Sequence, residues 1–360
     1  MTRRTRGRVA ALATATCLTV MAAGETPGWG QGIQFAPGEQ GHLRADRVRY
    51  DARTQVFSAE GDVQLTVGRL EIRAARLRLE RRTQIAYASG GVTVRGDDLG
   101  LAAAQVSYEI KTRMARATGG ALLTQRDVTV RAPQVTITLT TQLITASGGV
   151  TVVQGRSTLS GHALAADLIS RRAEVVGEAE LRRAAAPDAG ATSDAASAAA
   201  SREAVIHAHR MTLRWNPDEA EASGGVRILQ GERVARAERA RYVESSGRLD
   251  LEGDVVVERF GERPPLSGAG LAAHRLVVSL RDGGMDAHGG VRVTQDGRSA
   301  AGERAVYQER EQRVTVTGRV LLTDEDGNTV RADRVVILLN EESFEASGNV
   351  ETVFKVKPGK

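Results

Sequence analysis

The sequence predicts an all-β fold, namely an antiparallel repeat array of about ten units with a period of 29 residues. Three observations support this prediction: a glycine recurs at a fixed period, apolar and polar residues alternate around it, and turn-forming residues separate the alternating runs. The steps between the glycines are 29 residues, except for three steps of 47, 36 and 30 residues. A period sustained this long indicates that function resides in a surface or cavity built many times over. The recurring glycines are Gly61, Gly90, Gly119, Gly148, Gly177, Gly224, Gly253, Gly289, Gly318 and Gly348.

The strands of each unit follow from alternation around a small residue that stands 16 residues before the glycine. In the second unit this residue is Ala74; the apolar positions before it are Leu70 and Ile72. Those after it are Leu77 and Leu79, so the parity of the alternation switches. Because a slip of one residue turns over the buried face, the switch predicts a bulge or corner. Each unit is therefore expected to contain about three short strands, two of which meet at a corner that can join facing sheets.

Turn-forming residues lie between the alternating runs, for example Asp97-Asp98 and the segment Gln295-Asp296-Gly297. Such short links join antiparallel neighbours most easily, which disfavours a parallel β-helix. A β-solenoid stays the main structural alternative.

The domain organisation follows from the longest step, between Gly177 and Gly224, where 47 residues replace 29, an excess of 18. The segment 184–201 has this length and contains only Ala, Ser, Gly, Thr, Asp and Pro, which predicts a disordered insertion. It separates repeats one to five (41–183) from repeats six to ten (202–356). One continuous array with a long loop and two tethered modules both fit this pattern.

The composition favours a core of Val, Leu, Ile and Ala, because hydrophobic residues make up 41% of the chain and aromatic residues only 3%. The formal charge of +5 depends on four arginines within the first eight residues. Without them, the 49 basic residues become 45 against 44 acidic ones, so the charge gives no support to nucleic-acid binding.

The N-terminal segment 1–24 has the features of a secretory signal peptide. The four arginines precede an apolar run over residues 9–23, and Ala22-Ala23-Gly24 offers small residues for cleavage. This predicts export to the periplasm, with a buried N-terminal helix and an uncleaved anchor as the alternatives. The sole cysteine, Cys17, lies inside the run, so the mature chain would contain no disulfide.

No pattern of catalytic or metal-ligating residues is evident, and we expect no enzyme activity, no metal and no cofactor. Of the six histidines, only His207 and His209 share a strand face, and a metal site needs two further ligands. The recurring Gly-Gly pairs lack the Lys-Ser/Thr of a phosphate loop. Nearly all positive charge comes from arginine, which forms ion pairs across strands and can also bind phosphate or carboxylate bidentately.

Four segments carry a resemblance to a known family: Ala-Asp-Arg-Val-Arg-Tyr-Asp (45–51), Ala-Glu-Gly-Asp-Val (59–63), Gly-Glu-Arg-Ala-Val-Tyr (302–307) and Ala-Asp-Arg-Val-Val-Ile (332–337). In phase with the other repeats, over residues 41–356, they resemble the OstA-like family of LptA-type lipopolysaccharide transport proteins. The resemblance implies an elongated, twisted β-jelly-roll (a β-taco) whose apolar groove shields lipid A acyl chains. It also implies stacking through open strand edges, with LptC-like and LptD-like proteins or with further copies of the chain.

The resulting hypothesis is a periplasmic bridge protein that carries lipopolysaccharide toward the outer membrane, binds no nucleic acid and holds acyl chains between its sheets. The alternatives are a structural β-solenoid with a dry core and a protein-binding assembly factor that binds no lipid. The predicted groove residues are the inward apolar positions Val63, Leu65, Leu79, Val92, Val94, Val106, Ile137, Val150, Val152, Val226, Ile228, Val291 and Val293.

Overall fold

The computed structural model describes residues 41–67, 70–96, 99–125, 128–184, 204–214, 219–230, 233–243, 245–258, 270–279, 283–295, 297–338 and 343–354. The predicted signal segment 1–24 lies outside these ranges, as does the predicted insertion except for Ala184. Within the described ranges all regular secondary structure is β-strand, which confirms the all-β prediction. A search of these ranges for a helix long and apolar enough to cross a membrane found none.

The chain divides into two compact units, which we call the N-terminal and the C-terminal unit. Among the described residues, those from 41 to 181 and from 210 to 214 group with the N-terminal unit, and those from 182 to 209 and from 219 onward with the C-terminal unit. The strand β12 (Ala204–Arg214) is therefore divided between them. The domain boundaries expected from the repeat pattern stay a prediction.

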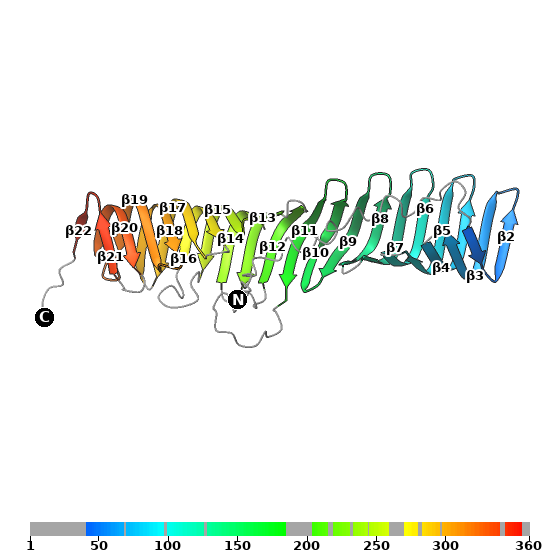
Figure 1. The fold of residues 1–360 in the computed structure, drawn as a ribbon, viewed down its shortest axis with the longest axis horizontal. Helices are drawn as coiled ribbons and strands as arrows, with labels where there is room; N and C mark the ends of the chain where they lie inside the picture. The colour runs from blue at the N-terminus through cyan, green and yellow to red at the C-terminus, as the bar shows by residue number, and fades with distance from the viewer. Residues whose placement is uncertain are drawn as a thin grey trace, which may run out of the picture. The chain divides into compact units, whose positions relative to one another are not determined.

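The N-terminal unit consists of long antiparallel strands that follow one another in chain order (Figure 1). The short strands β1 and β2 both pair with β3, and from β3 to β10 each strand pairs with the next. The strands are β1 (Gly41–Arg44), β2 (Arg47–Asp51), β3 (Val56–Val67), β4 (Leu70–Glu80), β5 (Ile85–Arg95), β6 (Leu99–Glu109), β7 (Met114–Gln125), β8 (Val128–Thr138), β9 (Leu143–Gln154), β10 (Ser157–Asp167) and β11 (Arg172–Arg183).

The C-terminal unit repeats this arrangement, and its described residues form nine antiparallel pairings. From β13 to β20 each strand pairs with the next, and the short β21 and β22 both pair with β20. The strands are β13 (Glu219–Gln230), β14 (Arg233–Val243), β15 (Arg248–Glu258), β16 (Gly270–Ser279), β17 (Met285–Gln295), β18 (Arg298–Gln308), β19 (Arg313–Thr323), β20 (Thr329–Leu338), β21 (Ser343–Ser347) and β22 (Glu351–Val353).

The predicted corner is present in the middle of the long strands. On β8 the buried positions are Val128, Val130 and Ala132 before the corner and Val135 and Ile137 after it, which confirms the parity switch. Between β8 and β9 the register shifts after the pair Arg131–Thr151 and resumes at Gln134–Ser147, so that one strand carries an extra residue. Such a bulge bends the strand and keeps the buried face continuous.

The repeating unit differs from expectation in the number of its strands. In the second to fifth repeats, a 29-residue unit contains two strands of 11 or 12 residues, not three short ones. The first repeat differs, with the short β1 and β2 followed by the long β3. The bulge does not end a strand, since the ladder of backbone pairs continues on both sides of it. The result is an all-β repeat array of antiparallel strands bent at a common corner, the architecture expected of a β-taco.

Candidate functional site

The inner face of each unit, defined as the face that carries the buried aliphatic side chains, has a fully packed row at the corner. The residue that follows the two bulge positions occupies this row. In the N-terminal unit its members are at most 3% exposed: Val63, Val92, Ala121 and Val150. In the C-terminal unit Val226, Val255, Val291 and Val320 are at most 2% exposed, whereas Val350 at the last corner is 52% exposed. Except at this last corner, the corner row is therefore packed core that holds the two halves of each bent strand together.

Towards the strand ends, the inner face carries side chains that are only half-buried. One such row in the N-terminal unit runs across five neighbouring strands as Phe57, Leu79, Ala86 and Tyr108, with the exposed Tyr50 at its end. On the other half of the bent strands, Leu65 and Ile72 form a second half-buried pair. We use the name outer rows for the inner-face positions that lie between the corner and the strand ends, on both halves of the bent strands. They offer aliphatic and aromatic surface that the fold itself does not fully cover.

The outer row closes towards the middle of the N-terminal unit. From β7 to β10 its members are Ala115, Ile137, Ile144 and Ala166, and all four are buried. The accessible part of this row therefore spans β2 to β6.

The thirteen sequence-predicted groove residues all lie within strands, and none is exposed. Their depth on the inner face differs, however, and divides them into two groups. The buried group is Val63, Val92, Val94, Ile137, Val150, Val152, Val226 and Val291. The half-buried group is Leu65, Leu79, Val106, Ile228 and Val293. Contact of either group with a ligand stays a prediction.

A second repeated feature, the four-residue turn between paired strands, escaped the sequence analysis. The turns that follow β2, β4, β6, β8 and β10 each contain a non-glycine residue with positive φ. An acidic residue opens four of these turns and accepts hydrogen bonds inside them. The Asp51 carboxylate accepts bonds of 2.9 and 3.2 Å from the backbone N–H groups of Arg53 and Thr54. The signal available in the sequence was an acid followed three residues later by Thr or Ser, at the same period of 29. The positive-φ residues are Gln55, Gln84, Arg113, Gln142 and Arg171.

The turn hydrogen bonds also affect protonation. Hydrogen bonds from Thr54 lower the pKa of Asp51 below its ordinary value, and those from Ser170 do the same for the pKa of Asp167. These carboxylates are therefore held in the charged form as turn acceptors.

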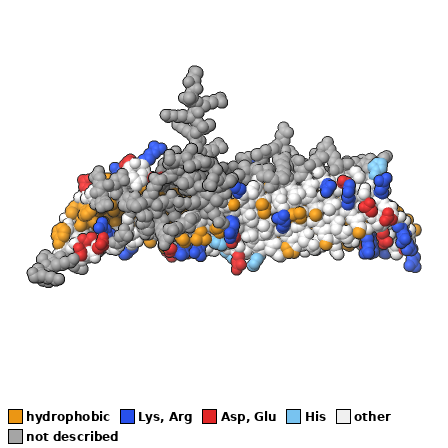
Figure 2. Space-filling model, turned by 90° about the horizontal axis from the view of Figure 1, so that it is seen from below, with side chains coloured by type: hydrophobic (Ala, Val, Ile, Leu, Met, Phe, Trp, Pro, Cys, Tyr) orange, Lys and Arg blue, Asp and Glu red, His pale blue; other side chains and the backbone are white. Residues whose placement is uncertain are grey.

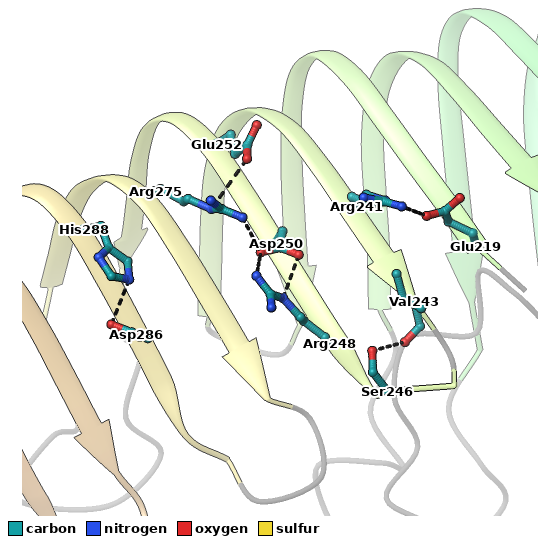
Figure 3. Close-up of polar contacts among 10 residues, drawn as sticks. All are labelled: Glu219, Arg241, Val243, Ser246, Arg248, Asp250, Glu252, Arg275, Asp286 and His288. Atoms are coloured by element: carbon teal, nitrogen blue, oxygen red, sulfur yellow. Dashed lines mark hydrogen bonds and ion pairs between the residues drawn. The ribbon is translucent and has the colours of Figure 1, made fainter.

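The outer face of the C-terminal unit carries ion pairs between neighbouring strands (Figure 3). Asp250 on β15 accepts a hydrogen bond of 2.8 Å from Arg248 and one of 3.1 Å from Arg275 on β16. Burial alone would raise the pKa of Asp250, but these two arginines lower it. Further along, Asp286 pairs with Arg304 at 2.7 Å.

The hydrogen bond from Arg304 lowers the pKa of Asp286, which also pairs with His288 at 3.0 Å. Glu219 and Arg241 form another pair in the same region (Figure 3). Cross-strand pairing thus accounts for Arg241, Arg275 and Arg304, and pairing within β15 accounts for Arg248, as the ion-pair interpretation of the sequence expected. Among the described residues, no cluster of three His, Cys, Asp or Glu side chains has the spacing of a metal site.

Comparison with known proteins identifies the family. A family model described as "LptA/(LptD N-terminal domain) LPS transport protein" matches residues 42–168, 129–283 and 205–343. A search of curated proteins found no match. Among solved structures, LptH from Pseudomonas aeruginosa, titled the LptA homologous periplasmic component of a lipopolysaccharide transport device, is 15% identical. That alignment covers 30% of this chain and 82% of LptH, with a TM-score of 0.29.

The WD40 domain of SCAP from fission yeast is 9% identical over 89% of this chain and 90% of that one, with a TM-score of 0.14. Neither structural likeness is strong enough to carry an argument. The three family matches, in contrast, together extend from residue 42 to residue 343. The chain therefore belongs to the LptA and LptD N-terminal domain family of lipopolysaccharide transport proteins.

Proposed function

We propose that this protein binds lipopolysaccharide in the periplasm and carries it toward the outer membrane, with the lipid acyl chains against the inner face. Family membership supports the lipid class. The observation that carries the proposal is the set of half-buried apolar side chains in the outer rows, beside a corner row that is already dry.

The two groups of predicted groove residues have different roles in this proposal. The half-buried positions, such as Leu79, Val106 and Ile228, contact acyl chains, because they have apolar surface still to lose. Each methylene buried there contributes roughly 0.8 kcal/mol. The buried corner positions, such as Val92 and Val150, support the face from within and do not touch the lipid. This protein supplies no energy for the movement of the lipid along the inner face, and a separate transporter drives that movement.

The first strands of the N-terminal unit and the last strands of the C-terminal unit supply the partner contacts in the proposal. Val48 and Tyr50 on β2 are 52% and 51% exposed, and Val353 on β22 is 51% exposed. In the described residues β2 pairs only with β3, and β22 only with β20. Open edges with apolar side chains accept a further strand. The proposed occupants are LptC-like and LptD-like proteins or a second copy of the chain.

The lipid part of the proposal is tested by photocrosslinking to lipopolysaccharide. A photoreactive residue replaces Leu79, Val106 or Ile228 in the half-buried group, with Val150 as the buried comparison and the outward, exposed Arg95 as the control. We expect adducts at the three half-buried positions and not at Arg95 or Val150. Absence of adducts at all three positions in a folded protein would contradict the proposal and favour a dry scaffold or a protein-binding factor.

A further inference from the structure

The first three long turns of the N-terminal unit carry five cations that the proposed acyl-chain contacts do not use. Arg53 lies in the turn between β2 and β3, Arg81 and Arg82 lie in the turn between β4 and β5, and Lys111 and Arg113 in the turn between β6 and β7. All five are exposed. Within the described part of the chain, no ion pair engages any of them. We call these five residues the cationic rim.

The acidic residues of the same turns are already engaged. Asp51 accepts two backbone hydrogen bonds within its turn. Glu80 accepts a 3.0 Å hydrogen bond from the Thr83 hydroxyl and pairs with Arg78 at 2.9 Å. Glu109 accepts a 2.8 Å hydrogen bond from the Thr112 hydroxyl. The three turns thus contain five basic residues and three acidic ones, and the acidic residues accept hydrogen bonds within the turns. The rim therefore has an excess of positive charge.

The cationic rim borders the accessible part of the outer row. Arg81 is two residues from Leu79 along the chain, and Lys111 is three residues from Tyr108. Arg113 acts on the Tyr108 phenol directly: burial raises the pKa of Tyr108, and the charge of Arg113 opposes the rise. Successive turns are two strands apart, which corresponds to about 10 Å. The cations therefore form a regular row beside half-buried apolar side chains.

The fourth turn provides an internal comparison. Its residues 138–142 are Thr, Leu, Thr, Thr and Gln, with no charge. It follows Ile137 and precedes Ile144, both of which are buried. Five cations thus lie in the three turns beside the accessible inner face, whereas beside the closed part the fourth turn has none and the fifth has only Arg171. In Figure 2, which shows the molecule from below, Lys and Arg side chains gather together with Asp and Glu side chains at the right-hand end of the view, which in Figure 1 is the end formed by β2 to β4.

We propose that the cationic rim binds the phosphate groups of the lipid whose acyl chains lie against the outer row. The inference rests on the proposed function, because it takes the lipid from there and adds the recognition of its headgroup. An amphiphile that carries phosphate groups next to its acyl chains matches a surface on which unpaired cations lie next to apolar side chains. Guanidinium groups bind phosphate with two parallel hydrogen bonds, which makes arginine suited to this role.

The test compares two variants of the full-length protein. The rim variant carries Arg53→Gln, Arg81→Gln, Arg82→Gln, Lys111→Gln and Arg113→Gln. The control variant loses the same five charges from exposed, outward positions on the strands: Arg116→Gln, Arg131→Gln, Arg227→Gln, Arg292→Gln and Arg334→Gln. Circular dichroism verifies that both variants are folded.

The probes are bisphosphorylated lipid A and the same lipid A stripped of both phosphates, each titrated against a photoreactive residue at Val106. For bisphosphorylated lipid A, we expect the half-saturating concentration to rise about tenfold in the rim variant and less than about twofold in the control. For the dephosphorylated lipid we expect no difference between the variants and the parent protein. Added salt should weaken binding of the bisphosphorylated lipid to the parent protein more than to the rim variant.

Four outcomes would overturn the proposal. Equal weakening in the rim and control variants would mean that only the net charge of the protein matters. If the parent protein binds both lipids equally well, the proposed function stands and the rim proposal fails. A single-stranded DNA oligonucleotide serves as a further probe. If the rim variant loses binding to the oligonucleotide but binds bisphosphorylated lipid A as well as the parent protein does, the rim is a general polyanion-binding surface. Failure of the parent protein to bind either lipid would instead contradict the proposed function itself, and the rim proposal with it.

Discussion

At the scale of single residues, the two bulge positions of a corner differ in how much space they leave for a side chain. Gly90 has φ of +83°, and a Cβ added there would lie 2.5 Å from the Cβ of Ala75 on the neighbouring strand. Gly91 has φ of +76°, but a Cβ there would meet no atom within 4 Å. Both positions favour glycine because their φ angles are positive. Only the first position also lacks space for a Cβ. The structure agrees, since Asp62, Glu178, Asp254, Arg319 and Asn349 occupy the second position in other corners.

This difference predicts unequal costs for two alanine substitutions. Gly91→Ala should lower the free energy of unfolding by about 1 kcal/mol, the cost of a left-handed backbone for a residue with a Cβ. Gly90→Ala should cost about 1–3 kcal/mol more, because Ala75 must move. Urea unfolding of both variants measures the two costs. Equal losses would show that the contact with Ala75 does not matter.

The ion pairs of Asp250 and Asp286 predict a dependence of stability on pH. Their pKa values are lowered in the folded protein, so the stability they supply is present above the unfolded-state pKa of about 3.9 and is lost as the pH falls through the folded-state pKa. Asp250→Asn should therefore flatten the acid side of the stability profile, measured by urea unfolding between neutral pH and pH ~3. Asp254→Asn, at an exposed corner position, is the control. A profile unchanged by Asp250→Asn would contradict the assignment.

At the scale of elements, the sequence predicts which side chains face inward but not how deeply they lie. Val63 and Leu65 share a face, yet Val63 is 1% exposed and Leu65 is half-buried. Alternation is a local property of one strand, whereas depth depends on the packing of the other half of the bent strands. The corner was predictable because a bulge leaves a parity switch in the sequence. The number of strands was not, because the pattern does not tell whether backbone pairing continues past the bulge.

The turn motif predicts a specific loss of stability at Asp167. Its carboxylate accepts hydrogen bonds of 2.9 and 3.1 Å from the backbone N–H groups of Ile169 and Ser170. Asp167→Ala removes the acceptor and should cost about 1 kcal/mol. Asp167→Asn keeps an acceptor oxygen and should cost less. Thermal unfolding of the two variants tests the order, and a greater loss for the asparagine variant would rule out this role for the turn bonds.

At the scale of the whole molecule, the proposed stacking through open edges predicts an effect of charge at the β2 end. Val48→Lys with Tyr50→Lys places two charges where apolar side chains are half exposed to solvent, so that association with a second copy would have to desolvate them. Self-association should weaken at least about tenfold in analytical ultracentrifugation. Val256→Lys, at a partly exposed position within β15, is the control. Unchanged association of the double variant would exclude the β2 end as the contact.

The pairing of strands with their immediate neighbours in the chain has a consequence for how the protein acquires its structure. In the strand pairs that the structure describes, paired residues lie close in the sequence: Glu71 pairs with Arg95, and Val128 with Gln154. Contacts of such short range keep the contact order low and place little entropic barrier before each new hairpin. A chain of this kind can fold repeat by repeat while its later part is still being delivered. Folding in this order does not depend on the C-terminus, as the predicted export of the chain across a membrane would require.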